Sequence, residues 1–284
     1  MVKTNNNNVM AENNLVELKG ALKTDAVKTK FFDMLGSKSA GFLTSIMNVV
    51  QNNALLQKAD TNSILLAAAQ AASLDLPINP NLGFSAIIPF NDTRNHRCVA
   101  TFQIMRDGWV ELCLRTGQFE YIVNEPVYEG ELVEKNRFTD TYIFDESKRT
   151  SDKIIGYMAA FKLTNGYKKT LFMTIDEVKE HGKKYSQTFR NNKGLWIDAF
   201  DAMARKTCLK LLLKKYAPKS IEVISKAVLS DQATFSGSFA NPQIEYVDNK
   251  TTTTPIVAEQ TEFEEVEDEQ PKQTDAPKDE EMSF

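Results

Sequence analysis

The stretch from Arg205 to Tyr216 reads RKTCLKLLLKKY and carries five cationic residues among its twelve. Lys206, Lys210 and Lys214 follow one another at intervals of four residues, so on an α-helix they would form a row with steps of about 6 Å. Ammonium groups at that spacing could neutralise successive phosphates of an extended nucleic-acid strand. A plain solvated face would also explain three lysines, but no acidic residue follows Asp201 in this helix to supply the intrahelical ion pairs of such a face.

The same predicted helix, residues 195–216, has an apolar side that would anchor it in a core. On a helical wheel the apolar residues gather apart from the lysine row: Phe200, Ala204, Cys208, Leu211 and Leu212. Arg205 lies apart from that row as well. We therefore expect the helix to bury one face and to present Lys206, Lys210 and Lys214 on another.

The charge of the chain is unevenly distributed. The formal net charge is −4, yet residues 231–284 hold 14 acidic and 3 basic residues, which leaves 24 acidic and 31 basic residues in the first 230. A basic body followed by an acidic segment favours a polyanionic partner. A globular domain with a solvated acidic tail is the alternative interpretation.

Further cationic residues occur in predicted turns and at strand ends, and aromatic residues alternate with them. Lysine and arginine neutralise the phosphate backbone while aromatic rings stack on bases, a combination typical of proteins that hold single strands without reading their sequence. We expect most of these aromatic side chains to lie in the core and two or three to contact the bases of the bound strand. The cationic candidates outside the helix are Arg106, Arg115, Lys183, Lys184 and Lys193.

Residues able to support catalysis are few. The chain contains no phosphate-binding loop of the G-x-x-x-x-G-K-[ST] type, no G-x-S-x-G turn and no H-E-x-x-H motif. Asp198 and Asp201 could share a magnesium ion, but two acids near a helix start also complement the helix dipole, which we favour. Cys98, Cys113 and Cys208 form no C-x-x-C pair, which indicates buried thiols rather than a zinc site or a disulfide framework. We expect a protein that is not an enzyme and requires no cofactor.

The order of predicted elements favours an α+β fold in which helices pack on antiparallel strands. Residues 42–50 and 61–73 have helical patterns, residues 84–90 and 97–103 form a predicted hairpin, and a short helix ends at Gly117. Four more strand-like runs precede the closing helices; they cover residues 119–123, 141–144, 154–163 and 168–174. Asn165 and Gly166 suit a two-residue turn between the last two runs.

Composition divides the chain into three parts. Residues 1–14 are rich in asparagine and are predicted to be disordered, and residues 231–284 are predicted to form a disordered acidic tail. The ordered core is expected over residues 15–230. No apolar run approaches the roughly 18 residues needed to span a membrane, and the N-terminus lacks a signal-peptide pattern, so we expect no membrane association and a cytoplasmic location.

Three segments together resemble the RecT family of phage recombinases. They occur in the family's order and place the resemblance over about residues 30–225. The segments are SLDLPINPNLGFSAIIPF (Ser73–Phe90), FQIMRDGWVELCLRTGQF (Phe102–Phe119) and WIDAFDAMARKTCLKLLL (Trp196–Leu213). The chain departs from the family pattern at Met105-Arg106-Asp107. Members read F-Q-[IL]-G-Y-[KR]-G in this segment, with a basic residue at the position of Asp107.

The resemblance implies an ATP-independent protein that binds single-stranded DNA and anneals complementary strands during homologous recombination. The implied fold is the annealing-protein β-meander with packed helices and a basic groove lined by a hairpin and a helix. The resemblance places Gln103, Arg106 and Arg115 near this groove and Arg205, Lys206 and Lys210 on the DNA backbone.

The resemblance also implies partners. They are single-stranded DNA, the annealed duplex and further copies of the chain in a ring or helical filament, with a phage exonuclease and a host single-strand-binding protein as further partners. Mg²⁺ could support annealing, and the expected setting is the cytoplasm of a bacterial host or a phage-infected cell. The terminal residues DEEMSF resemble the acidic tip of bacterial single-strand-binding proteins, so the tail could compete for that tip's partners or cover the basic groove.

Two other classes of function compete with annealing. A passive single-strand-binding or partner-interaction protein would bind DNA with a steep salt dependence and leave the annealing rate unchanged. A nuclease or ATPase has the least support because the sequence offers no site for either reaction.

Overall fold

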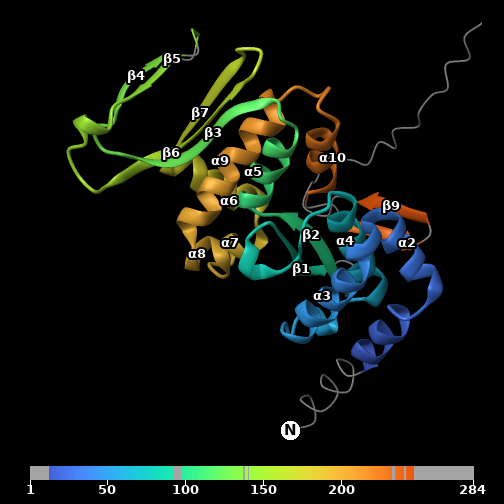
Figure 1. Cartoon of the computed structure of the whole chain (residues 1–284). Coiled ribbons are helices and arrows are strands. Elements are labelled where there is room, and N and C mark those ends of the chain that lie inside the picture. Colours follow the sequence, from blue (N-terminus) through green and yellow to red (C-terminus); the bar gives the residue numbers. More distant parts are fainter. Residues whose placement is uncertain are drawn as a thin grey trace, which may run out of the picture. The chain divides into compact units, whose positions relative to one another are not determined.

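The fold is α+β with antiparallel strands, as the sequence predicts. We describe it from a computed structural model, which defines residues 13–92, 97–136, 138–139, 141–231, 234–239 and 241–245. These residues all belong to one compact unit that spans residues 1–249 (Figure 1). The acidic segment 250–284 lies outside the described residues, as do residues 1–12. Within the described part, no helix is long and apolar enough to cross a membrane.

Helices form the N-terminal part of the unit. Residues 13–21 are helical, and α2 (Asp25–Leu35), α3 (Ser39–Gln51) and α4 (Thr61–Ser73) follow. The α4 helix begins where Asp60 accepts a hydrogen bond from the Ser63 amide at 2.8 Å. Its run of alanines and leucines is buried on almost every side, because α2 and strand β2 both pack against it.

A hairpin and a short helix follow α4. Strands β1 (Ser85–Asp92) and β2 (Arg97–Ile104) pair antiparallel, and α5 (Arg106–Arg115) starts directly after β2. A Cβ at Gly108 would lie 2.0 Å from the Phe84 carbonyl oxygen, so only glycine lets α5 approach the start of β1 this closely. The predicted hairpin and helix are both confirmed.

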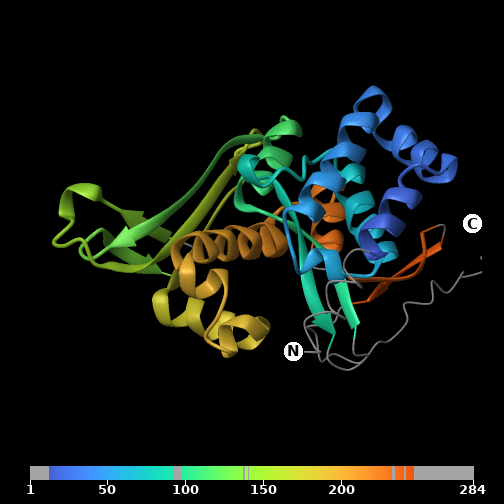
Figure 2. The ribbon, with the colours of Figure 1, turned by 90° about the horizontal axis from the view of Figure 1, so that it is seen from below.

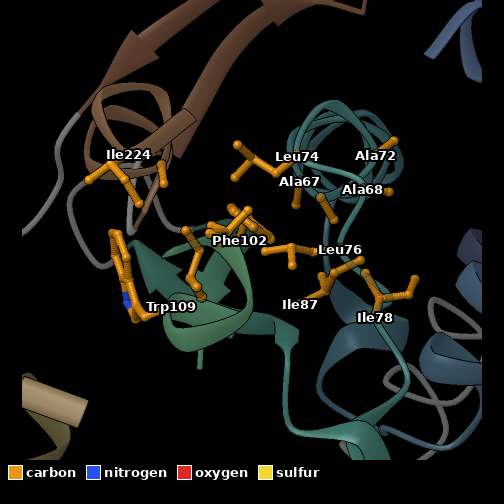
Figure 3. Packing of buried hydrophobic residues seen from close by; sticks show 14 of the residues in the cluster. Ala67, Ala68, Ala72, Leu74, Leu76, Ile78, Ile87, Phe102, Trp109 and Ile224 are labelled. Carbon is orange, nitrogen blue, oxygen red and sulfur yellow. The ribbon is translucent and has the colours of Figure 1, made fainter. Parts of the chain in front are cut away.

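Side chains from α4, β1, β2, α5 and α10 (Glu222–Ser230) meet in the core. Phe102, Trp109, Leu76 and Ile224 are all buried and lie together in Figure 3. This shared core joins the hairpin, the N-terminal helices and the C-terminal helix. The hairpin is therefore fixed from both sides.

A three-stranded sheet forms the second part of the unit. Its order is β3–β6–β7, a β-meander into which a separate ribbon, β4–β5, is inserted between β3 and β6 (Figure 1). The strands are β3 (Phe119–Tyr128), β4 (Leu132–Asn136), β5 (Thr141–Phe144), β6 (Ile154–Leu163) and β7 (Lys168–Thr174). Phe144 of the ribbon lies against Phe172 of the sheet, with 6.2 Å between ring centroids.

The turn between β6 and β7 differs from the predicted two-residue loop. The Leu163 amide donates to the Tyr167 carbonyl, and the Gly166 amide donates to the Leu163 carbonyl, so three residues form the loop. Gly166 has φ 87° and takes the left-handed position at its end. A type I turn followed by a left-handed glycine suits the strand twist as well as a two-residue turn does.

The closing helix packs along the sheet, and three short helices precede it (Figure 2). They are α6 (Ile175–Tyr185), α7 (Gln187–Arg190) and α8 (Leu195–Asp198), followed by α9 (Phe200–Tyr216). The single helix predicted over residues 195–216 is therefore wrong at its start. Ala199 has φ −141° and ψ 54°, which is outside the helical range and separates α8 from α9.

The chain remains structured beyond residue 230, where the sequence predicts a disordered tail. Strands β8 (Thr234–Ser238) and β9 (Asn241–Glu245) form a hairpin next to α4 and β2. Phe239 at its turn stacks on Phe31 with 6.0 Å between centroids and packs against Leu66, and Lys30 lies over its ring. The acidic composition of residues 231–284 as a whole conceals this apolar anchor.

Candidate nucleic-acid interface

Lys206 lies inside the protein rather than on a DNA-facing row. Only 4% of the residue is exposed, and its ammonium group donates to the Gln103 side-chain oxygen at 3.0 Å and contacts the Met105 sulfur at 3.7 Å. Burial lowers the pKa of Lys206 to about 8; the nearby Asp231 carboxylate raises it and Lys210 lowers it further. The predicted exposed position of Lys206 is wrong.

Lys210 is also engaged within the fold. Its ammonium group lies 2.5 Å from Oδ2 of Asp231, whose side chain is fully buried, and 19% of the Lys210 side chain remains exposed. The second Asp231 oxygen accepts a hydrogen bond from the Ile104 amide at 2.7 Å. Lys210 therefore stands at the boundary between the interior and the surface.

The lysine row is not exposed as predicted because other elements pack around α9 on several sides. The sheet lies along one side of α9, and α5 and α10 pack against it elsewhere. Buried residues consequently occur around the helix, including Thr207, Cys208, Leu209, Leu212 and Leu213, whereas Leu211 is only partly buried. Of the three lysines, Lys214 alone is exposed, because α9 emerges from its surroundings near its C-terminus.

Arg205 forms ion pairs that the sequence did not predict. Its guanidinium group lies 2.9 Å from Asp201, four residues earlier on α9, and 2.9 Å from Glu125 on β3. The expectation that this helix lacks intrahelical ion pairs is therefore wrong at its first turn. The same arginine borders a cavity of about 450 Å³ whose wall also includes Glu131, Glu146 and Arg149.

The remaining candidates of the hairpin–helix segment have internal partners too. Arg115 pairs with Glu111 at 2.8 Å and donates to the carbonyl oxygens of Leu74 and Asp75, so it ties α5 to the end of α4. Arg106 lies 3.0 Å from Asp107, with 42% of its side chain exposed. The acid that departs from the family pattern thus offsets the charge of the arginine beside it.

Exposed lysines occur on α6 and near the end of α9. Lys183 and Lys184 on α6 are exposed, as is Lys214 on α9. Burial, together with the charges of Lys210, Lys184 and Lys214, lowers the pKa of His181 to about 4, so three cations act on this imidazole. We call Lys183, Lys184 and Lys214 the α6–α9 cationic surface.

Packing fixes the orientation of this surface. Arg190 donates to the carbonyl oxygens of Lys183 and Lys184, which closes the end of α6. A Cβ at Gly182 would lie 3.1 Å from the Phe189 ring and 3.3 Å from the Trp196 ring, so α7 and α8 pack closely here. Lys193 is exposed in the connection between those two helices.

Aromatic rings accompany these cations. Tyr185 lies 4.6 Å from His181 between ring centroids, and Lys184 lies over the Tyr185 ring at 5.2 Å. On the neighbouring side of α9, Lys169 and Lys215 both lie over the ring of Tyr216. Of the aromatic residues expected to alternate with cations, most are buried, whereas Tyr167 and Tyr185 are 43% and 40% exposed.

The site contains no metal-binding cluster of acidic, histidine or cysteine side chains within the described part of the chain. Cys113 and Cys208 are buried, and burial raises the pKa of each thiol to about 12, so both are inert apolar fillers. Asp198 ends α8 while Asp201 starts α9, and Asp201 neutralises Arg205. The arrangement can bind anions through cations and rings.

One known protein family matches this chain. The model of the RecT family matches residues 40–252, which is most of the chain. The chain belongs to the RecT family. It is 38% identical over 227 residues to the uncharacterized protein YqaK of Bacillus subtilis (strain 168), a match that covers 80% of this chain and 76% of YqaK. It is 27% identical over 180 residues to the protein RecT of Escherichia coli (strain K12), covering 62% of this chain and 65% of that protein.

Membership of the RecT family supports DNA binding and a general role in recombination. The matched region 40–252 contains both the α6–α9 cationic surface and the buried Lys206–Lys210–Asp231 group. It also extends past residue 230 and so includes the β8–β9 hairpin.

Sequence reasoning missed two residues that shape the site. Asp231 is counted with the acidic tail, and no local signal distinguishes a buried aspartate at a helix end from a solvated one. His181 is partly buried, and the charges of Lys210, Lys184 and Lys214 act on it. Its position on α6, four residues before Tyr185 and one residue before Gly182, offered a signal that this helix face packs against another element.

Proposed function

We propose that this RecT-family protein binds single-stranded DNA and anneals complementary strands without ATP. The observation that carries the proposal is the α6–α9 cationic surface, where Lys183, Lys184 and Lys214 are exposed and Lys184 lies over the ring of Tyr185. Cations that follow a backbone and rings that stack on bases hold a strand without reading its sequence. A strand held in this way keeps its base edges available for pairing.

The proposal includes no catalytic residue. Annealing requires that two strands be brought together with their charges neutralised, so binding energy alone can accelerate it. We propose that the protein requires no cofactor and that Mg²⁺ supports annealing by screening phosphates, without a dedicated protein site. The setting would be phage-type homologous recombination in a bacterial cytoplasm.

Further partners belong to the same proposal. The annealed duplex is the product, and further copies of the chain would extend the cationic surface along a strand as a ring or helical filament. A phage exonuclease would supply the single strand, and a host single-strand-binding protein would be displaced from it. Family membership supports single-stranded DNA and further copies of the chain as partners, and the exonuclease and the host protein are proposed in addition.

An annealing assay tests the proposal. Complementary oligonucleotides, one labelled with a fluorophore and the other with a quencher, are mixed at low concentration with and without the protein, in the absence of ATP. We expect pairing to accelerate at least about tenfold, with half-saturation below micromolar protein at low salt. Pairing at the uncatalysed rate, both with and without Mg²⁺, would show that the proposed activity is wrong.

Passive single-strand binding is the second candidate. The observation that favours it is that Lys206, Arg115 and Arg205 have internal partners, which reduces the number of cations available to two strands. A passive binder would shift the mobility of oligo(dT) with a steep salt dependence and leave the pairing rate unchanged. The two candidates are thus separated by the same assay.

A further inference from the structure

Three hydrogen-bond donors meet near the carboxylate of Asp231. Oδ1 accepts from the Ile104 amide at 2.7 Å, and Oδ2 lies 2.5 Å from the ammonium group of Lys210. The Lys206 ammonium group is buried next to them and interacts electrostatically with the same carboxylate. The Asp231 side chain has no exposure to solvent.

This donor set is one that binds phosphate. A backbone amide and two ammonium groups around an oxyanion are the elements from which proteins build phosphate sites. The two lysines carry two positive charges against the single charge of Asp231, and the hydrogen-bond partner of Lys206 is the neutral side chain of Gln103. A tetrahedral oxyanion offers more acceptor oxygens than a carboxylate and so could accept from all three donors.

The site opens toward the proposed DNA surface. Lys214 is exposed on the α6–α9 cationic surface, and Lys210, one helical turn earlier, retains 19% side-chain exposure. The two lysines are four residues apart on α9, so they lie on the same side of that helix. A strand that follows Lys214 would reach Lys210 after about 6 Å, close to the step between its phosphates.

We propose that Lys206, Lys210 and the Ile104 amide form a phosphate-binding site that Asp231 occupies in the free protein and leaves when a phosphate of the DNA backbone enters. The DNA part of this inference rests on the proposed function. The existence of an anion site does not, because it follows from the donors alone.

The position of Asp231 allows such an exchange without disruption of the core. Asp231 directly follows α10. The helix is anchored in the core by two buried residues, Ile224 about two turns before Asp231 and Ala227 about one turn before it. The last turn is held by a hydrogen bond between Ser230 and Gln70 at 3.0 Å. We infer that this last turn moves when the carboxylate leaves.

Phosphate rescue tests the anion site without DNA. Asp231→Asn keeps the shape and the Ile104 contact but removes the charge, so the variant should unfold several degrees below the parent. About 50 mM inorganic phosphate, at constant ionic strength, should raise its Tm by roughly 5 °C in a saturable way, and the Tm of the parent by less than about 1 °C. The rescue should be lost in Asp231→Asn/Lys210→Gln, which lacks a donor. Asp201→Asn is the matched control, since it removes an acid from the partly exposed start of α9.

Several results would overturn the inference. The first is an Asp231→Asn variant whose stability does not respond to phosphate, including one that stays unfolded at every phosphate concentration. Equal rescue in the double variant or in Asp201→Asn would also overturn it, because the effect would then be nonspecific salt stabilisation.

Hydrogen exchange on the unaltered full chain tests the displacement. Saturating oligo(dT) should accelerate exchange of the amides of residues 229–231 by about tenfold, while amides around Lys183 and Lys214 become slower. Unchanged or slower exchange at residues 229–231 in the DNA-bound protein would mean that Asp231 stays in place. If oligo(dT) does not bind at all, the proposed function fails, and the phosphate experiment still decides whether the anion site exists.

Discussion

The ammonium group of Lys206 and the side-chain oxygen of Gln103 lie 3.0 Å apart in the interior, joining the closing helix α9 to strand β2. Gln103 stands just before the turn into α5, so this contact fixes the hairpin–helix segment against the helix that carries the cationic residues. Two of the segments that carry the family resemblance therefore meet through a structural contact. Loss of DNA binding after a change at Lys206 would not by itself identify a DNA contact.

Substitutions of Lys206 should separate stability from charge. Lys206→Met replaces a buried ammonium group with an apolar chain of similar length, and we expect the free energy of unfolding to change by no more than about 1 kcal/mol. Lys206→Glu places a carboxylate beside the buried Asp231 and should cost about 3–5 kcal/mol. Urea denaturation measures both values. Equal destabilisation by the two substitutions would contradict the assigned environment.

Neutralising the α6–α9 cationic surface should weaken DNA binding and flatten its salt dependence. In Lys183→Gln/Lys184→Gln/Lys214→Gln, the slope of log Kd against log salt for oligo(dT) should decrease by about 2, because each lost phosphate contact removes roughly 0.7. Fluorescence anisotropy at several salt concentrations measures the slope.

A charge-matched variant supplies the control for that experiment. Lys19, Lys23 and Lys28 are exposed in the N-terminal helical region, and their replacement by Gln removes the same total charge. This control should leave the slope within about 0.3 of the parent value. Equal effects of the two triple variants would mean that net charge, rather than this surface, determines binding.

His181 should make stability depend on pH below neutrality. Burial and the charges of Lys210, Lys184 and Lys214 lower its pKa from 6.5 to about 4 in the folded protein. The unfolded chain therefore takes up this proton at a higher pH than the folded protein does, and the free energy of unfolding falls as the pH decreases from about 6.5 to 4.

A glutamine at this position isolates that contribution. Between pH 6.5 and 4, the free energy of unfolding of His181→Gln should fall by about 1–2 kcal/mol less than that of the parent. This difference in energy allows for solvent screening at the partly exposed ring. Denaturant unfolding at several pH values gives the difference. Parallel pH profiles for the two proteins would exclude a depressed pKa.

Gly108 should not accept a side chain. Gly108→Ala would place a Cβ 2.0 Å from the Phe84 carbonyl oxygen, so the start of α5 must move. We expect the free energy of unfolding to fall by about 3 kcal/mol or more. Gly41→Ala, in the exposed helix α3 with no atom within 4 Å of the new Cβ, should stabilise by about 0.5–1 kcal/mol. The thermal midpoints of the two variants should move in opposite directions.

Local patterns were sufficient to predict most of the elements. The β1–β2 hairpin, α5, β6 and β7 all occur where periodicity and turn residues place them. The break at Ala199 was not predictable, because alanine favours a helix, whereas its backbone here lies outside the helical range. The sequence also gave no clear signal for β4, whose residues are mostly exposed and pair only with β5 among the described strands.

The candidate site was less predictable than the fold. A helical wheel shows which residues share a side of α9 but not how many neighbours enclose the helix, so Lys206 and Lys210 were expected at the surface. Their shared partner Asp231 is separated from Lys210 by a loop and a whole helix. Such a long-range contact leaves no periodic trace in one sequence. Lys183 and Lys184, grouped in the sequence with cations of turns and strand ends, lie instead in the last turn of helix α6.

The aromatic anchor at Phe239 determines where the acidic end of the chain can be removed. A stop codon after Ser230 would delete Asp231 and Phe239 together with the acidic residues, leaving Lys210 without its carboxylate and Phe31 and Leu66 without the ring that covers them. Such a shortened protein would be damaged before any effect of the acidic residues could be measured. A stop after residue 249 keeps both strands of the hairpin and removes 11 of the acidic residues, so it is the deletion that reports on charge alone.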